Sequence, residues 1–351
     1  MKKMRPFKLN SLKALLAGAL LLTASPLAAQ SPPQGLADYV AGLAYEYKAD
    51  GSSEPALAAQ YYEKAAAAGS REALLALARL AGPGEALWQG PDHWRDRLLA
   101  ASRAGWPEAA FRLAEALEKG QIKDSGSAYA AFYLQAAAAG HGPAALRLGN
   151  LYLTGQGGLP RDEEQAALWL ALAAANHMDE AALTLGKFFY EANPAIALRW
   201  LERAPALPEA GYLLGQLYLK ERRIVEAQGA LTSSADQGYP EAHLTLGLMN
   251  LDNDFGLRPN PREALRHFKV AAQARLPEGA YQLAHMYLKG LATPKDSITA
   301  AFWLHQAASE KHPTAAEEFN KLTYNFTSGQ KKRLERMIAD GVTPTMQLPP
   351  S

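Results

Sequence analysis

The chain has 351 residues, of which 48% are hydrophobic and 20% are charged, and its formal net charge is +1. These proportions are those of a folded soluble chain and exclude an intrinsically disordered one. The chain has no cysteine, which excludes a disulfide framework and any thiolate metal site.

The N-terminus has the layout of an export signal. Five basic residues lead it, an apolar run covers residues 14–22, and small residues with one proline fill residues 24–29. This order predicts a secretory signal peptide over residues 1–29, cleaved after Ala29, with a short flexible leader over residues 30–36. An uncleaved membrane anchor is the alternative. A lipoprotein would need a cysteine for its lipid.

Cleavage would change the charge and the expected compartment. Residues 1–29 contain five basic and no acidic residues, so their loss moves the formal net charge from +1 to −4. A mildly acidic chain argues against nucleic acid as a partner. No later stretch approaches the ~20 apolar residues of a membrane span. We therefore expect a periplasmic protein without a transmembrane segment after signal removal.

A recurring run of small residues predicts the architecture. Eight segments end at intervals of 31 to 37 residues, at Gly69, Gly105, Gly140, Asn176, Leu207, Gly238, Arg275 and Lys311. A period of this size is typical of stacked helix pairs. Three residues before these ends stand small residues, among them Ala66, Ala137, Ala173 and Ala308, and seven before them stand large apolar ones. Because offsets of three and seven share one helical face, we expect a neighbouring helix to approach at the small position.

A second series of small residues marks a second helix in each repeat. Its five glycines are Gly42, Gly149, Gly186, Gly215 and Gly247. A mid-helix glycine costs about 1 kcal/mol relative to alanine, so each of these needs a structural reason. We expect that a Cβ atom there would collide with the partner helix.

The repeats resemble a known family at these positions. Leu148 to Tyr152, Thr154 to Gly157, Asp162 and the run from Ala166 to Ala173 are similar to the SEL-one-like repeat, a longer-looped relative of the tetratricopeptide repeat. The resemblance covers residues 37–312. It implies a right-handed α-solenoid of about eight stacked antiparallel helix pairs that serves protein–protein contact. It implies no catalytic residues and no cofactor.

Two regions depart from the repeat and are candidate partner-binding sites. The repeats near 180–238 are shorter, and Glu221, Arg222 and Arg223 stand where the glycine loop is lost. Trp88 lies in an irregular stretch after Gly82-Pro83-Gly84, where local packing is the alternative explanation. Trp169, Trp200 and Trp303 are expected in the core. Beyond the repeats, residues 313–341 should form capping helices and residues 342–351 a disordered tail.

No constellation of residues points to catalysis. Gly155 to Gly158 follow a helix and lack a Lys-Ser/Thr pair, so we interpret them as a turn, with Asp162 capping the next helix. Asp252, Asp254 and Glu263 match three positions of a calcium loop, but Leu257 stands where that loop needs glycine. The eight histidines form no two-His motif at metal-ligand spacing in the sequence.

Three functions follow from these features. The first is a periplasmic interaction scaffold for a protein partner in exopolysaccharide assembly or export, cell-wall remodelling or motility. The second is a module that binds a glycan or another small envelope ligand, favoured if aromatic side chains line a concave face. The third is an enzyme within a repeat fold, for which the sequence offers no site.

Overall fold

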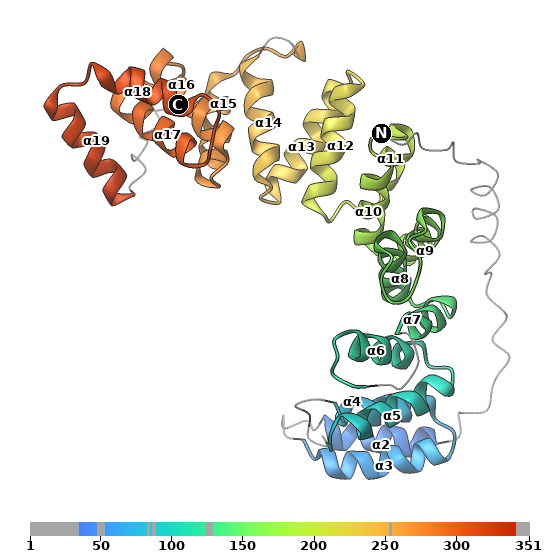
Figure 1. The fold of residues 1–351 in the computed structure, drawn as a ribbon. Coiled ribbons are helices and arrows are strands. Elements are labelled where there is room, and N and C mark those ends of the chain that lie inside the picture. Colours follow the sequence, from blue (N-terminus) through green and yellow to red (C-terminus); the bar gives the residue numbers. More distant parts are fainter. Residues whose placement is uncertain are drawn as a thin grey trace. The chain divides into compact units, whose positions relative to one another are not determined.

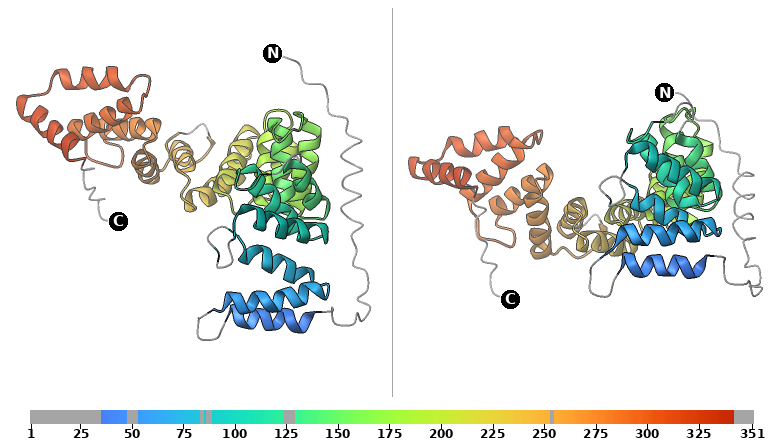
Figure 2. Two further views of the ribbon diagram at one scale, coloured as in Figure 1. Left: turned by 60° about the horizontal axis from the view of Figure 1, so that its bottom comes forward. Right: turned by 90° about the horizontal axis from the view of Figure 1, so that it is seen from below.

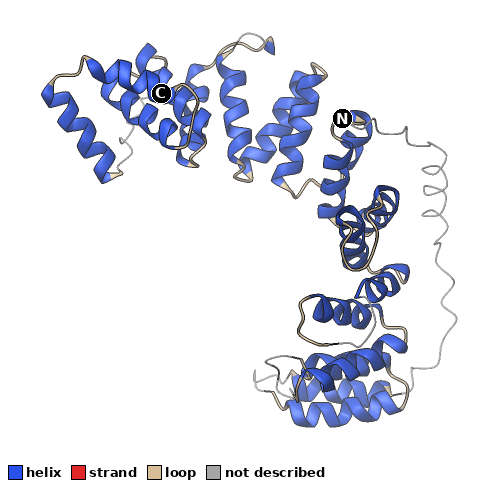
Figure 3. Cartoon of the chain, viewed as in Figure 1, coloured by secondary structure: helices blue, strands red, loops and turns tan. Residues whose placement is uncertain are grey.

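The computed structural model describes residues 35–47, 53–82, 85, 89–123, 129–252 and 255–341. In these residues the chain forms eighteen α-helices and no strand, which confirms the all-α prediction (Figures 1 and 3). None of the described helices is long and apolar enough to cross a bilayer. The predicted signal peptide, Trp88, Asp254 and the tail at 342–351 lie outside the described residues.

The helices follow one another as pairs, in which helix A is followed by helix B. The chain divides into two compact units, Met1–Leu185 and Gly186–Ser351, which are described separately. The pairs of the first unit are α2 (Leu36–Glu46) with α3 (Pro55–Ala67), α4 (Arg71–Leu80) with α5 (Pro91–Arg103), α6 (Pro107–Glu118) with α7 (Tyr129–Ala138), and α8 (Gly142–Thr154) with α9 (Glu163–Ala175). Two further views of the chain show the same succession of helices within this unit (Figure 2).

The second unit continues the same pattern. Helix α10 (Asp179–Phe189) crosses the boundary between the units. The pairs are α10 with α11 (Pro194–Leu201), α12 (Pro208–Lys220) with α13 (Ile224–Asp236), α14 (Pro240–Leu251) with α15 (Pro261–Gln273), and α16 (Pro277–Lys289) with α17 (Ser297–Ser309). The described residues therefore form the eight helix pairs that the sequence period predicts.

The glycines of the A helices lie where the two helices of a pair are closest. A Cβ atom on Gly149 would stand 2.6 Å from Cγ of Leu170 in α9, and one on Gly215 would stand 2.5 Å from Cγ of Leu231 in α13. Gly42, Gly186 and Gly247 face Tyr62, Leu201 and Phe268 of their B helices in the same way. Real Cβ atoms do not approach other atoms so closely, so the packing role predicted for the five glycines is confirmed.

The B helices end in a repeated hydrogen-bond pattern. In α3 the N–H of Gly69 donates to the carbonyl of Ala66 at 2.9 Å, and the N–H of Ser70 donates to that of Ala65 at 2.9 Å. This is the Schellman arrangement, which requires a left-handed residue, here Gly69 with φ +92°. Six further B helices end in the same way, at Gly105, Gly140, His177, Gly238, Arg275 and Lys311.

This pattern corrects the register in two repeats. The left-handed residue after α9 is His177, one residue beyond the predicted end at Asn176. No residue from 178 to 221 has positive φ, so the repeat end predicted at Leu207 is wrong. The bulky positions there belong to Leu170 and Leu201. Trp169 and Trp200 are only half-buried beside them, whereas Trp303 is in the core as predicted.

In each of the seven Schellman turns, the carbonyl that closes the turn belongs to a small residue four positions before the left-handed residue. This position is fully buried in all seven turns, at Ala65, Ala101, Ala136, Ala173, Ser234, Ala271 and Ala307. Of the four small residues highlighted in the sequence, Ala137 and Ala173 are fully buried, but Ala66 and Ala308 are half-buried. Across the eight repeats, six of the predicted small positions are buried, the remaining four of these being Ser102, Ala204, Ala235 and Ala272.

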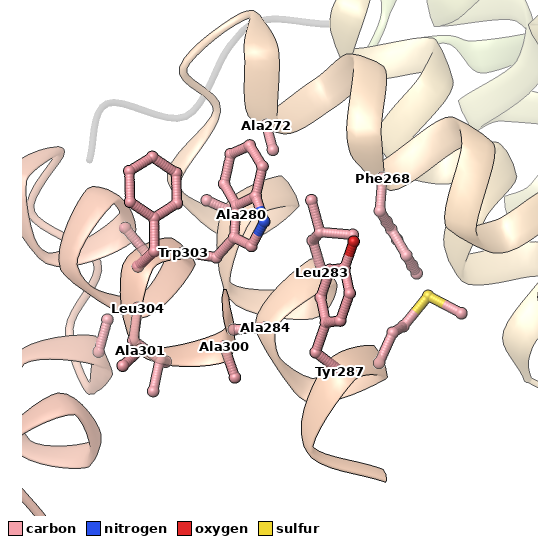
Figure 4. Packing of buried hydrophobic residues seen from close by; sticks show 14 of the residues in the cluster. Phe268, Ala272, Ala280, Leu283, Ala284, Tyr287, Ala300, Ala301, Trp303 and Leu304 are labelled. Carbon is pink, nitrogen blue, oxygen red and sulfur yellow. The ribbon is translucent and has the colours of Figure 1, made fainter. Parts of the chain in front are cut away.

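The core of the second unit shows how these positions combine (Figure 4). Phe268 of α15, Leu283 and Tyr287 of α16, and Trp303 and Leu304 of α17 are buried together with alanines of the same helices. Helices α18 (Ala315–Tyr324) and α19 (Ser328–Asp340) complete this cluster through Phe319 and Leu334. The last helix pair is thereby covered on its C-terminal side.

The glycine contacts lead to a stability prediction with a matched control. Gly149→Ala should lower the free energy of unfolding by about 1–3 kcal/mol, because its Cβ collides with Leu170. A Cβ atom on Gly229 in α13 would have no neighbouring atom within 4 Å, so Gly229→Ala should instead raise stability by about 1 kcal/mol. Thermal and urea unfolding of both variants would check this, and the same sign of change in both would contradict it.

The Schellman turns lead to a second stability prediction. Lys311 adopts φ +64°, a conformation that favours glycine. Lys311→Gly should therefore raise the free energy of unfolding by about 1 kcal/mol. Gly140 adopts φ +86° with no atom near its Cβ position, so Gly140→Ala should lower it by a similar amount through backbone conformation alone. Calorimetric melting would measure both, and a destabilised Lys311→Gly variant would refute the argument.

Candidate interaction surface

The predicted charged cluster lies in the turn between α12 and α13, within the second unit. Arg222 has φ +60°, its N–H donates to the carbonyl of Leu219 at 3.1 Å, and the N–H of Arg223 donates to that of Tyr218 at 2.9 Å. Arg222 is therefore the left-handed residue of a Schellman turn that ends α12. Its backbone role was not visible in the sequence, because arginine is not a typical residue for this conformation.

Arg223 is bound within its own turn. Its guanidinium lies over the Tyr218 ring at 4.4 Å, and it donates to Glu226 at 3.1 Å and to Glu221 at 3.4 Å. A hydrogen bond within Glu226 itself and the hydrogen bond from Arg223 lower the pKa of the Glu226 carboxyl. The cluster is thus compensated in charge, and reversing the charge of Arg223 would set a carboxylate against two others.

An exposed apolar residue lies beside these charges. Val225 is 78% exposed in the first turn of α13. On the α12 side, Lys220 binds Glu191 at 3.3 Å and lies over the Tyr190 ring at 4.5 Å. We define the α12–α13 surface as Tyr190, Glu191, Lys220, Glu221, Arg223, Val225 and Glu226. Of these residue types, tyrosine and arginine are enriched at protein interfaces.

Several groups with shifted pKa values have structural roles between helix pairs. The hydroxyl of Tyr133 donates to Glu118 at 2.7 Å, and Arg147 of the next helix A binds the same carboxylate at 2.7 Å. Burial, followed by the hydrogen bond to Glu118, raises the pKa of Tyr133. Tyr62, Glu46 and Arg79 form the same link earlier in the chain, and burial and Glu46 raise the pKa of Tyr62.

The structure also brings together two histidines whose spacing in the sequence did not indicate a contact. Nδ1 of His243 in α14 lies 2.9 Å from Nδ1 of His267 in α15. Burial lowers the pKa of both, so one neutral ring donates to the other. No group of three or more His, Cys, Asp or Glu side chains in the described part of the chain could hold a metal ion. The two side chains form a polar contact between the helices of one repeat.

Two other histidines bind a glutamate of the preceding helix A, and one of them also caps a helix. His141 accepts from the N–H of Ala144 at 3.2 Å and lies 2.8 Å from Glu108, and this contact is the main cause that lowers the Glu108 pKa to about 2. His312 lies 3.1 Å from Glu278. His141 is thus the N-cap of α8, whereas the N-cap of α18 is Thr314.

The loops that resemble ion-binding motifs are accounted for by the helices they connect. Gly155, Gly157 and Gly158 all have positive φ, and Asp162 accepts from the N–H groups of Glu164 and Gln165 at 3.0 Å, as predicted. Asp252 is the residue after α14, and Glu263 lies in the first turn of α15, where it binds Arg266 at 3.3 Å. Glu263 is therefore held within its own helix.

A hollow in the first unit is small. It has a volume of about 180 Å³ and is lined by Ala56, Ala59, Gln60, Glu63, Leu77, Ala81, Gln89, His93 and Arg97. Small-molecule sites typically measure roughly 300–1,000 Å³. This hollow gives little support to a site that would enclose a small ligand.

The chain is similar to proteins from bacteria and fungi. It is 30% identical over 241 residues to an uncharacterized protein of Neisseria meningitidis, a match that spans 63% of this chain and 46% of that protein. It is 34% identical over 102 residues to the chitin synthase regulator SKT5 of Saccharomyces cerevisiae, which spans 29% of this chain and 14% of the regulator. The chain thus spans less than half the length of these curated relatives.

Two solved structures share the fold. One is c5321, a protective antigen of uropathogenic Escherichia coli with an SLR fold, at 20% identity and a TM-score of 0.68, covering 88% of this chain and 68% of the antigen. The other is a Sel1 repeat protein from Oxalobacter formigenes, at 21% identity and a TM-score of 0.61, covering 89% of this chain and 90% of that one. These likenesses agree with a solenoid of helix pairs.

The family model of the Sel1 repeat matches six segments that together make up more than half of the chain. They are residues 37–70, 107–141, 142–177, 182–204, 240–275 and 277–312. The matched segments correspond to the helix pairs and turns given above. Sel1 repeat proteins are scaffolds for protein–protein interaction. The chain belongs to the Sel1 repeat family.

Proposed function

We propose that this protein is a periplasmic scaffold that holds a protein partner in a process of the bacterial cell envelope. The observation that carries the proposal is how the repeats use their side chains. The large apolar residues of the helix pairs fill the space between helices, and the groups with the strongest pKa shifts link neighbouring helices. The described residues therefore present helix and turn surface to a partner, which is characteristic of stacked repeats.

The relatives favour polysaccharide-handling machinery as the setting. Chitin synthase regulators of two yeasts match part of this chain, at 34% and 27% identity. By their names these proteins regulate an enzyme that makes a structural polysaccharide. For this chain we propose an analogous task, in exopolysaccharide assembly or export or in cell-wall remodelling, with motility complexes as a further setting. The export signal expected at residues 1–29 would bring it to that compartment.

The α12–α13 surface is the proposed contact region for the partner. Its turn is fixed by hydrogen bonds and its charges are paired, so a partner would find it already ordered. Ordered surfaces lose less conformational entropy on binding than flexible ones. Val225, which is 78% exposed, supplies its apolar contact.

A substitution at Val225 tests this contact without disturbing the fold. Val225→Glu places a carboxylate in the first turn of α13, where the helix dipole favours it. We expect an unchanged helical spectrum and melting temperature but about tenfold weaker capture of the native partner from envelope extract, because an apolar contact becomes charged. Quantitative mass spectrometry of affinity-purified complexes would measure the loss.

Tyr324 provides the matched control. It is 83% exposed in α18, outside the α12–α13 surface, so Tyr324→Glu makes a similar change at a distant site and should leave capture intact. Equal loss in both variants would argue against this surface. If the wild-type protein captures no protein reproducibly but binds a purified envelope glycan, the scaffold proposal yields to the glycan-binding alternative.

The compartment is tested by the mature N-terminus. We expect the protein in the periplasmic fraction with Gln30 as its first residue, because the small residues before it resemble a signal peptidase site. Intact-mass and N-terminal peptide analysis of fractionated cells would show this. A protein that starts at Met1 and stays with the inner membrane would instead support an uncleaved anchor.

A further inference from the structure

The outward side of the first described helix is entirely apolar. In α2, Leu36 is 43% exposed, Val40 is 53% exposed and Tyr47, the residue after the helix, is 65% exposed. Ala37 and Ala44 are exposed as well. These five residues follow one another at helical spacing on one face, which we call the α2 face. The face carries no charged side chain.

The other A helices show that part of this face is a packing surface. The residues that align with Ala37 are buried in all seven of them, at Ala73, Ala109, Ala144, Ala181, Ala210, Ala242 and Gly279. Those that align with Ala44 are buried in six, at Leu80, Ala116, Leu151, Leu217, Met249 and Met286. In α16, a Cβ atom on Gly279 would stand 2.6 Å from that of Ala271 in α15. These positions therefore pack against a preceding helix, which α2 lacks among the described residues.

At its other positions the α2 face is more apolar than the equivalent positions of the other A helices. Where α2 has Leu36, six of the other seven A helices have glutamate, at Glu72, Glu108, Glu180, Glu209, Glu241 and Glu278. Where Tyr47 stands, six have a polar or charged residue, at Lys119, Thr154, Glu191, Lys220, Asp252 and Lys289. The apolar character of α2 is therefore not explained by its place as the first described helix alone. Positions that are polar elsewhere have become apolar, which is typical of a surface that a protein covers.

The pattern of the α2 face is complementary to itself. Ala37 and Ala44 lie two helical turns apart on either side of Val40. If two α2 helices lie antiparallel, with a two-fold axis near Val40 and Ala41, Ala37 of each copy faces Ala44 of the other. Small residues at these places let the helices approach closely, and the uncharged face brings no like charges together. Continuation of the array head to tail is blocked, since α18 and α19 cover the last helix pair.

We propose that the α2 face is a two-fold interface through which two copies of this chain associate. A two-fold interface uses the same patch on both copies, as this pattern requires. The patch is one short helix face, smaller than the ~1,200–2,000 Å² buried in a standard stable interface. The dimer should therefore be weak and form in a concentration-dependent way at micromolar concentrations and above.

Cysteine cross-linking tests the geometry directly, because the natural chain contains no cysteine. The two-fold axis places residue 40 of each copy next to its counterpart, so the full-length Val40→Cys protein should form an interchain disulfide under mild oxidation. Tyr47 is more exposed, but in the antiparallel pair its two copies lie about 20 Å apart, at about 1.5 Å of rise per residue. Tyr47→Cys should therefore cross-link poorly. Equal or greater cross-linking through Tyr47→Cys would overturn the proposal.

Sedimentation of the protein purified with its natural processing tests the association itself. We expect the wild type to shift from monomer to dimer as its concentration rises, and Val40→Glu to stay monomeric with an unchanged helical spectrum and melting temperature. A wild type that is monomeric throughout would overturn the proposal, whether the face is then covered by preceding residues of the chain or by a different protein. A dimer that persists in Val40→Glu would place the interface elsewhere and overturn it too.

Discussion

The close approach of helices at small residues is the constraint on which the rest of this structure depends. A glycine in helix A faces a large side chain of helix B, and a buried alanine or serine ends the tightly packed part of helix B. The glycine site lacks room for another methyl group, and the alanine or serine site is fully buried. Because each repeat contacts chiefly its neighbours, the stability of the array is the sum of these local contacts. An overpacked site would therefore act first on its own repeat.

Polar links join the pairs where the apolar contacts end. Glu118 accepts from Tyr133 of its own pair and from Arg147 of the next, and Glu46 is used in the same way. A buried carboxylate that lost one of these partners would carry an uncompensated desolvation cost. Such links favour one stacking register over another. The raised pKa values of Tyr62 and Tyr133 in these links are explained by burial and packing, so in this chain a shifted pKa is weak evidence for a catalytic group.

Much of the fold could be predicted from the sequence, because glycine inside a helix is destabilising and its presence is explained by a contact within its own helix pair. The eight helix pairs and the contacts of Gly149 and Gly215 followed from that reasoning. The one-residue error at Asn176 arose because either Asn176 or His177 could adopt the left-handed conformation, and only the backbone distinguishes them. Because the bulky position was counted from Asn176, the prediction placed Trp169 where Leu170 is buried.

The candidate surface was less predictable, since it depends on contacts between turns. The sequence indicated Glu221 to Arg223 as an irregular charged segment, but it could not show that Arg222 fixes the backbone or that Arg223 is held by two carboxylates and a ring. His243 and His267 are 24 residues apart and meet only because α14 and α15 pair. The apolar side of α2 could be recognised only after the equivalent positions of the other A helices were known to be buried.

The Schellman turns have a further consequence for how such an array can vary. In six of the B-to-A joints, three residues separate the helices. The N–H of the third residue closes the Schellman turn of the first helix, and the second helix starts directly after this residue. A residue that ends one helix and starts another leaves no place for an insertion. The A-to-B loops have no such restriction, and they range from three residues after α12 to ten after α4. Most of the length variation thus lies in the A-to-B loops, although the B-to-A joint after α11 is also longer, at six residues.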